Sequence, residues 1–474
     1  MNVFTRRKFL RQGACAAVGM GALANQILGL RALNAAIDQS GSAGDDYRAL
    51  VCIFLYGGND ANNLIIPRGT SEYAAYAAAR QNLAIPRSEL LSINPGQGDG
   101  REWGLHPALG DLDESGNYVP GGLHELFEQD KLAIVGNVGT LVAPITRAEW
   151  LNGSATVPSQ LFSHADQQVQ WQTSVSQGIS PTGWGGRLAD LLRPLNSGSI
   201  SMSMSLAGTN TFQVGQDVTQ YQIKPWGSIA LRDYQHATDN PDHKPSRAVD
   251  NLLNLAHGNL IQDAYSGIQA RAIKNDRLLN ESLDEISPED LTWFDNNFTT
   301  SNSLSYQLQM VAKLIHARQS LGMKRQIYFC SVGGYDTHGE QLLSHANLLS
   351  ELSLGLREFY DSTVHFGIED CVTTFTSSDF GRTFPTNGEG SDHGWGSHQL
   401  VMGGAVQGGE IYGNMPVLEV DGPNDTGRGR WIPTTSVDEY AATLAKWFGL
   451  QASDMGQVFP NIGRFSRPDM GFMG

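Results

Sequence analysis

The sequence has little cysteine, few charged residues and no long apolar run beyond its N-terminal region. Four cysteines in 474 residues exclude a scaffold that depends on many disulfides. Charged residues make up 17% of the chain, which argues against a coiled coil or a mainly disordered protein. No later stretch reaches the roughly 18 consecutive apolar residues of a transmembrane helix, so we expect no integral membrane segment once the N-terminal region is removed.

Positive charge is also scarce, because 32 basic residues face 48 acidic residues and the formal net charge is −16. Such a charge repels phosphate backbones, so we expect no nucleic-acid partner. It also repels anionic substrates, so chemistry on an anion would need a local positive centre such as a metal ion. What the chain does contain is 40% hydrophobic residues and 54 glycines, which indicate a sizeable core with many tight turns.

The first 36 residues have the order of regions that is typical of an export signal. A charged start with Arg6 and Arg7 is followed by a weakly apolar stretch over residues 13–30 and then by small residues. The twin arginine followed by Phe-Leu resembles a Tat signal, which exports folded proteins. We therefore expect a Tat-type signal peptide over residues 1–36 and a periplasmic or extracellular protein.

After residue 45, apolar strands alternate with amphipathic helices. The pattern predicts strands at 50–55, 132–138, 326–332 and 371–376, and helices at 71–80, 123–129, 304–322, 341–362 and 436–450. Continuous apolar strands that alternate with helices favour an α/β fold with a mostly parallel central sheet, covered on both faces. We expect one domain over residues 45–474, in which the segment 200–300 is an insertion or cap.

Three predicted strands are each followed by a polar loop that carries an aspartate: Asp60, Asp336 and Asp379. Because the carboxyl ends of parallel strands meet at one edge of a sheet, we expect these carboxylates to lie close together. Their repulsion would be relieved by a bound cation. With His338 and His393 as nitrogen donors, the expected cofactor is a divalent metal ion: zinc, manganese or iron.

Each of these residues also has an ordinary structural interpretation. An aspartate after Gly-Gly or Ser-Ser is a common turn or N-cap residue. Ser163 is placed to begin a helix, where it would serve as an activated nucleophile or simply as an N-cap. His164 beside it suits an acid or base as well as packing, and Arg382 suits either an oxyanion contact or a structural salt bridge.

Longer motifs resemble those of one family and together cover nearly all of the chain from residue 45. Among them are IFLYGGNDANNLIIP, LFSHADQQVQWQT, GYDTHGEQ, SDFGRT and DHGWG. With the Tat start, they resemble the exported bacterial domain-of-unknown-function family fifteen-oh-one (DUF1501). The fold of that family is related to the alkaline phosphatase and sulfatase superfamily. The resemblance implies an alkaline-phosphatase-like domain.

The resemblance also implies roles for the residues named above. It makes Ser163 the nucleophile, and it makes Asp60, Asp336 with His338, Asp379 and His393 the metal ligands. The sequence departs from the superfamily at Phe380, where a histidine usually follows the aspartate. It departs again in the spacing of two residues between Asp336 and His338. These departures favour a single-metal or rearranged site, or a metal-free relative.

Two main functions stay open from the sequence, beside some other metal chemistry. The first is a metal-dependent hydrolase of phosphate or sulfate esters, in which Ser163 and His164 act on a small-molecule ester and Arg382 steadies the transferring group. The second is a catalytically silent exported scaffold or binding protein with an unknown protein partner, which Phe380 favours. Metal analysis of the exported protein would distinguish the two.

Overall fold

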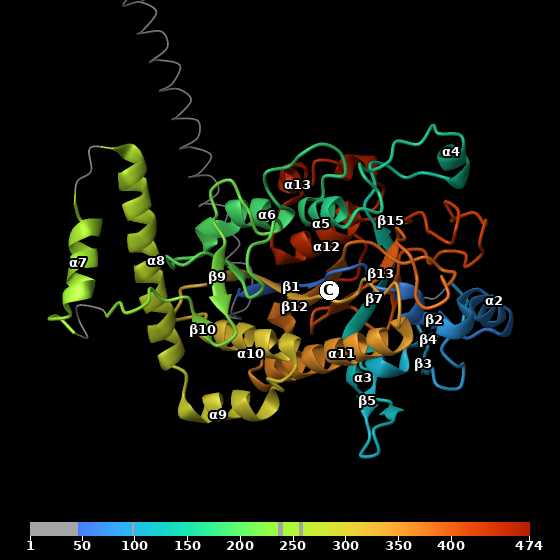
Figure 1. The fold of residues 1–474 in the computed structure, drawn as a ribbon, viewed down its shortest axis with the longest axis horizontal. Helices are drawn as coiled ribbons and strands as arrows, with labels where there is room; N and C mark the ends of the chain where they lie inside the picture. The colour runs from blue at the N-terminus through green and yellow to red at the C-terminus, as the bar shows by residue number, and fades with distance from the viewer. Residues whose placement is uncertain (1–45, 97–98, 236–239, 256–258) are drawn as a thin grey trace, which may run out of the picture. The chain divides into compact units, whose positions relative to one another are not determined.

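The computed structural model describes residues 46–474 except 97–98, 236–239 and 256–258. The expected signal peptide at 1–36 lies outside these residues. Tyr47–Gly474 form one compact unit, shown in Figure 1. Among the described residues, no helix combines the length and apolar character needed to cross a bilayer.

The unit is built on a ten-stranded sheet in the order β10-β9-β8-β11-β1-β12-β13-β7-β14, with β15 beside β7. Its centre is β1 (Arg48–Leu55), flanked in parallel by β11 (Arg325–Val332) and β12 (Val372–Ser378). All but the first residue of β1 is buried, which explains its unbroken apolar run. The sheet confirms the predicted α/β fold with a mostly parallel sheet.

The other strands complete the sheet on both sides of this centre. The strands that share the direction of β1 are β8 (Ser203–Ser205), β9 (Tyr221–Lys224), β7 (Leu132–Gly139), β14 (Ile411–Tyr412) and β15 (Thr435–Ser436). The antiparallel strands are β10 (Gly227–Ser228) and β13 (Ser397–Met402). Because β8 to β10 belong to the sheet, the expected insertion over 200–300 includes part of the sheet itself.

Helices cover both faces of the sheet (Figure 1). On one face lie α3 (Gly122–Glu128), α10 (Ser303–His316) and α11 (Gln341–His365). On the other lie α5 (His164–Thr173), α6 (Trp184–Leu192), α12 (Val437–Phe448) and α13 (Met455–Val458). A capping box between Ser436 and Glu439 fixes the start of α12, inside the range 436–450 predicted for this helix.

Smaller elements surround this core. The remaining helices are α2 (Thr70–Arg80), α4 (Arg147–Leu151), α7 (Lys244–Leu253), α8 (Leu260–Asp284) and α9 (Pro288–Asn297). A three-stranded sheet joins β2 (Ile65–Pro67), β4 (Trp103–Leu105) and β3 (Leu91–Ile93), and β5 (Asp111–Leu112) pairs with β6 (Tyr118–Val119).

Candidate metal centre

The loops that follow the three central strands start side by side at one edge of the sheet. Leu55 at the end of β1 pairs with Val332 of β11 and with Ser378 of β12. The polar residues after these strands therefore emerge together, as the parallel pairing predicted. Helix α5 begins close to them, because the ring of its first residue, His164, contacts Asp379 and Asp336.

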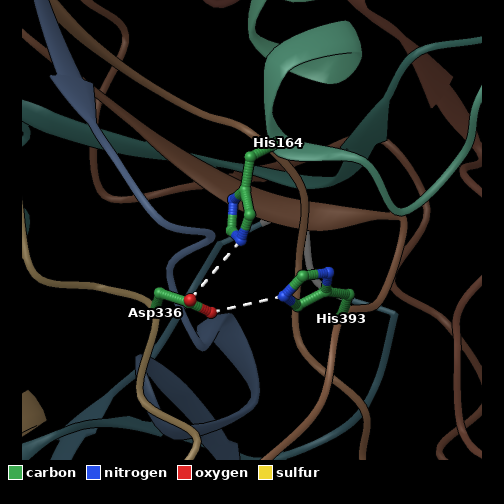
Figure 2. Close-up of side chains that lie close together, drawn as sticks. All are labelled: His164, Asp336 and His393. Atoms are coloured by element: carbon green, nitrogen blue, oxygen red, sulfur yellow. Dashed lines mark hydrogen bonds and ion pairs between the residues drawn. The ribbon is translucent and has the colours of Figure 1, made fainter.

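His164, Asp336 and His393 form the centre of the site. One donor atom from each residue lies within 4.8 Å of the others. Nε2 of His164 is 3.5 Å from Oδ2 of Asp336, and Nε2 of His393 is 3.3 Å from Oδ1. Figure 2 shows the two rings pointing at the two oxygens of the one carboxylate. Two imidazoles and a carboxylate are a donor set that suits zinc or iron.

Hydrogen bonds on the far side of each ring decide which nitrogen faces the centre. Nδ1 of His164 lies 2.7 Å from the carboxylate of Asp379, and Nδ1 of His393 lies 2.8 Å from the carbonyl oxygen of Phe162. Both neighbours are acceptors, so each Nδ1 carries the proton and each Nε2 presents a lone pair. Nε2 of His164 is buried and has no hydrogen-bond partner in the described part of the chain. This arrangement is the one that metal-binding histidines adopt.

Asp379 is positioned to orient His164 and does not itself face the centre. Burial raises the pKa of its carboxyl group, whereas hydrogen bonds from Gln168 and His164 lower it. Gln168 donates to the same oxygen as His164, at 2.8 Å. Asp379, a predicted metal ligand, therefore lies behind His164 and contacts the centre through that ring.

A third imidazole lies next to the centre. Nε2 of His338 is 3.1 Å from Oδ1 of Asp336 and 3.1 Å from Nε2 of His393. On its other side, Nδ1 lies 3.4 Å from the carboxylate of Asp392. His338 thus lies beside the set, whereas the donor atoms that all lie within 4.8 Å of one another are those of His164, Asp336 and His393.

Arg382 holds the central carboxylate from behind. Its Nη1 donates to Oδ1 of Asp336 at 2.7 Å, and its buried guanidinium also contacts the carbonyl oxygens of Gly57 and Ser391. Partial burial acts against ionisation of Asp336, but the hydrogen bond and charge of Arg382 lower the pKa of that carboxyl group. Of the two interpretations of Arg382, the structure shows the salt bridge and not the oxyanion contact, because its donors are directed at protein acceptors.

Asp60 lies apart from the cluster, although the sequence placed it among the metal ligands. It is fully buried, and Arg80 and Gln341 both donate to its Oδ2. A guanidinium at this oxygen occupies the position that an ion would need. A relay connects Asp60 to the centre, in which Ser391 donates to Gln341 at 2.6 Å and accepts from Arg382 at 3.4 Å.

Phe380 and Ser163 flank the histidines in different ways. The buried ring of Phe380 lies 4.8 Å from the ring of His164 and 4.6 Å from that of His393, and it forms an apolar wall behind them. Ser163 is the N-cap residue of α5, as predicted, but its Oγ donates to Asp166 at 2.6 Å. The hydroxyl is therefore held by its own helix.

Sequence reasoning missed four residues of the site, namely Phe162, Gln168, Asp392 and Arg430. The spacing of four between His164 and Gln168 puts both on one helix face and was a usable signal. The other contacts have no local signal. Phe162 adopts a positive φ of 72°, and Arg430 lies 4.2 Å over its ring while donating to the carbonyl oxygen of His393 at 2.8 Å.

Comparison with known proteins identifies similarity at two levels. The profile of a family described as "Protein of unknown function (DUF1501)" matches residues 47–454. Among curated protein sequences, none matches the chain.

Solved structures give weaker likenesses. One is Ps i-CgsB in complex with k-i-k-neocarrahexaose, at 9% identity and a TM-score of 0.31, over 89% of this chain and 77% of that one. Another is the PsFucS1 sulfatase from Pseudoalteromonas sp., at 9% identity and a TM-score of 0.33, over 86% and 68%. TM-scores this low do not establish a common fold.

Proposed function

The chain belongs to the DUF1501 family, and we propose that this member is an exported metal-dependent hydrolase of phosphate or sulfate esters. The observation that carries the proposal is the convergence of two oriented histidines on one ionised carboxylate. His164, Asp336 and His393 would hold the ion, and His338 lies beside Asp336 as a neighbouring imidazole.

The donor atoms fit a divalent ion chemically. Metal–nitrogen and metal–oxygen bonds of about 2.0–2.2 Å need donors roughly 3–4 Å apart, close to the separations seen here. The unpartnered, buried Nε2 of His164 is costly without a cation to accept its lone pair. Asp336 is partly exposed, so an ion at this place would remain accessible to a small substrate.

Each residue around the centre has a distinct role in the proposal. An ion held there supplies a Lewis-acid charge that activates water and offsets negative charge on the ester. Asp379 and Phe162 fix the proton on Nδ1 of the two histidines, and Arg382 keeps Asp336 ionised. Water is the attacking group in this proposal, since the hydroxyl of Ser163 is bonded to Asp166.

Arg430 supplies positive charge beside the centre, which a chain of net charge −16 needs in order to attract an anionic ester. Its Nε is bound to the carbonyl oxygen of His393. Within the described part of the chain, its two terminal nitrogens make no hydrogen bond to protein. A guanidinium with free terminal donors suits phosphate or sulfate oxygens.

The first experiment measures metal content in the full chain, exported through its own signal, by mass spectrometry. We expect about one zinc, manganese or iron ion per chain, and less than about a tenth of that in His164→Ala, Asp336→Ala and His393→Ala. His365→Ala is the matched control, because that histidine is exposed and stacks on Trp293 far from these contacts. Equal metal content in all variants would refute the site.

The second experiment measures turnover with aryl phosphate and aryl sulfate esters. We expect hydrolysis that disappears with chelation and in Asp336→Ala, while His365→Ala behaves as the parent.

A second candidate function is a silent binding protein, which the fully engaged guanidinium of Arg382 favours because the expected oxyanion contact is not formed. Bound metal without turnover on either ester class would support that candidate over the hydrolase.

A further inference from the structure

Exposed apolar side chains are concentrated in one short segment of the protein. Nearly half of the large hydrophobic side chains that the described structure leaves exposed lie between Trp226 and Ile268. Most of them belong to α7 and to the N-terminal half of α8, which run beside each other (Figure 1). Monomeric proteins rarely expose contiguous apolar patches larger than a few hundred Å².

Helix α8 buries only one half of its apolar stripe. Ile261, Tyr265 and Ile268 follow a spacing of four and three residues, which aligns them on one face, and they are 79%, 63% and 54% exposed. Leu279, eleven residues after Ile268, continues this stripe and is fully buried. The C-terminal half of α8 therefore packs on its own protein, while the N-terminal half presents the same stripe to solvent.

Further exposed apolar side chains lie close to this stripe in the sequence. Leu252 on α7, Leu255 after it and Leu260 at the start of α8 are each more than half exposed, as are Ile261, Tyr265 and Ile268. Six such side chains expose roughly several hundred Å² in all, which is as much as a monomer usually leaves open. A standard interface buries about 800 Å² on each partner.

Charge favours a second copy of the chain as the occupant. The segment 244–284 contains five basic and five acidic residues, whereas the whole chain has a net charge of −16. Two copies repel each other over most of their surface, but not over this neutral segment. An anionic membrane surface would instead favour an excess of lysine and arginine on the polar face.

We propose that the N-terminal half of α8 pairs in an antiparallel manner with the same segment of a second copy, so that the protein is a homodimer. A two-fold axis near Gly267 would set Tyr265 against the partner's Ile268 and Ile261 against the partner's Ala272. Such an interface is self-complementary, because each contact occurs twice. Gly267 is open to close approach, since a Cβ placed there meets only the end of Arg271, at 3.9 Å.

Sedimentation velocity of the full chain over a range of concentrations tests the proposal. We expect a dimer, and we expect Ile261→Glu/Ile268→Glu to raise the dissociation constant by roughly tenfold or more. Ile179→Glu is the matched control, because Ile179 is 98% exposed and lies outside α8. A parent chain that stays monomeric overturns the proposal, as does a dimer that the double variant leaves intact.

A cross-linking experiment separates loss of pairing from loss of folding. Gly267→Cys lies near the proposed axis and should form a disulfide-linked dimer under mild oxidation, whereas Leu112→Cys, exposed on the β5–β6 hairpin, should not. The parent chain shows the background from its own cysteines. Equal cross-linking by both variants would overturn the antiparallel arrangement. If the chain is monomeric and co-floats with anionic lipid vesicles in a density gradient, the patch binds a membrane surface and not a second copy.

Discussion

Asp379 and His164 form a carboxylate–imidazole pair in which Oδ2 lies 2.7 Å from Nδ1. The aspartate follows the last residue of β12, and the histidine is the first residue of α5. Because Asp379 is buried and also accepts from Gln168, its carboxylate is fixed in place. The pair thereby determines which nitrogen of His164 faces Asp336, although the two residues lie 215 positions apart.

Replacing Asp379 should weaken metal binding without removing a donor atom. Asp379→Asn leaves a neutral acceptor beside Nδ1, so His164 is held less firmly in the required tautomer. We expect metal affinity to fall about 10–100-fold, measured by competition with a chromophoric chelator. Asp166→Asn is the control, because Asp166 lies on the same helix and binds Ser163. Unchanged affinity in Asp379→Asn would contradict the orienting role.

Replacing Asp60 should cost stability and leave metal stoichiometry unchanged. Asp60→Asn leaves the buried guanidinium of Arg80 without its charged partner. We expect the free energy of unfolding to fall by about 3–5 kcal/mol, measured by denaturant titration. Metal per folded chain should equal that of Asp113→Asn, a control on an exposed loop. Lost metal with unchanged stability would restore Asp60 as a ligand.

Asp438, near the start of α12, should make stability depend on pH. Burial raises the pKa of its carboxyl group from 3.8 to about 7. The folded protein therefore binds a proton that the unfolded chain has released between these values, and stability contributed by this group falls as pH rises from about 4 to 7. The full effect is roughly 4 kcal/mol above that window.

Asp438→Asn isolates this effect. The variant should be more stable than the parent at pH 8, and the difference should shrink towards pH 4, as measured by denaturant unfolding at each pH. A difference that is the same at every pH would show that Asp438 titrates with an ordinary pKa.

Ser163→Ala tests the nucleophile that the family resemblance implies. Because Oγ of Ser163 is bonded to Asp166, we expect metal content to stay the same and turnover of aryl esters to stay within about threefold of the parent. Asp166→Ala, which frees that hydroxyl, is the companion variant. Abolished turnover in Ser163→Ala with metal retained would make the serine the attacking group instead of water.

We also propose export through the Tat pathway. The signal for it would lie in residues 1–36, outside the described structure. Arg6→Lys/Arg7→Lys should keep the protein in the cytoplasm, whereas Lys8→Arg should leave export unchanged. Cell fractionation followed by immunodetection measures both. Normal export of the double variant would show that another route is used.

The sequence predicted the sheet well because its strands carry their own signal. The apolar runs of β1 and β11 are largely buried, so composition alone revealed them. The same logic placed Asp336 at the sheet edge, in the loop that follows β11. It failed for Asp60, because the competing partner Arg80 comes from a helix twenty residues later and has no signature in the sequence.

His164 shows a second limit of sequence reasoning. It was predicted as an acid or base because it starts a helix beside a serine, and nothing local indicates that its ring reaches Asp336. Arg382 was expected to make either an oxyanion contact or a structural salt bridge, and the structure shows a salt bridge with the same carboxylate. Both outcomes depend on how α5 and the loop after β12 dock together, which is a tertiary property.

The relay behind Asp336 has a consequence for handling the protein. Arg382, Ser391, Gln341 and Asp60 hold the carboxylate through contacts within the chain, so we expect folding not to depend on an ion in the way that small zinc fingers do. Treatment with a chelator should therefore yield an apoprotein with an unaltered circular dichroism spectrum. Reconstitution of that apoprotein with cobalt(II) would then give a visible absorption band that reports directly on coordination number.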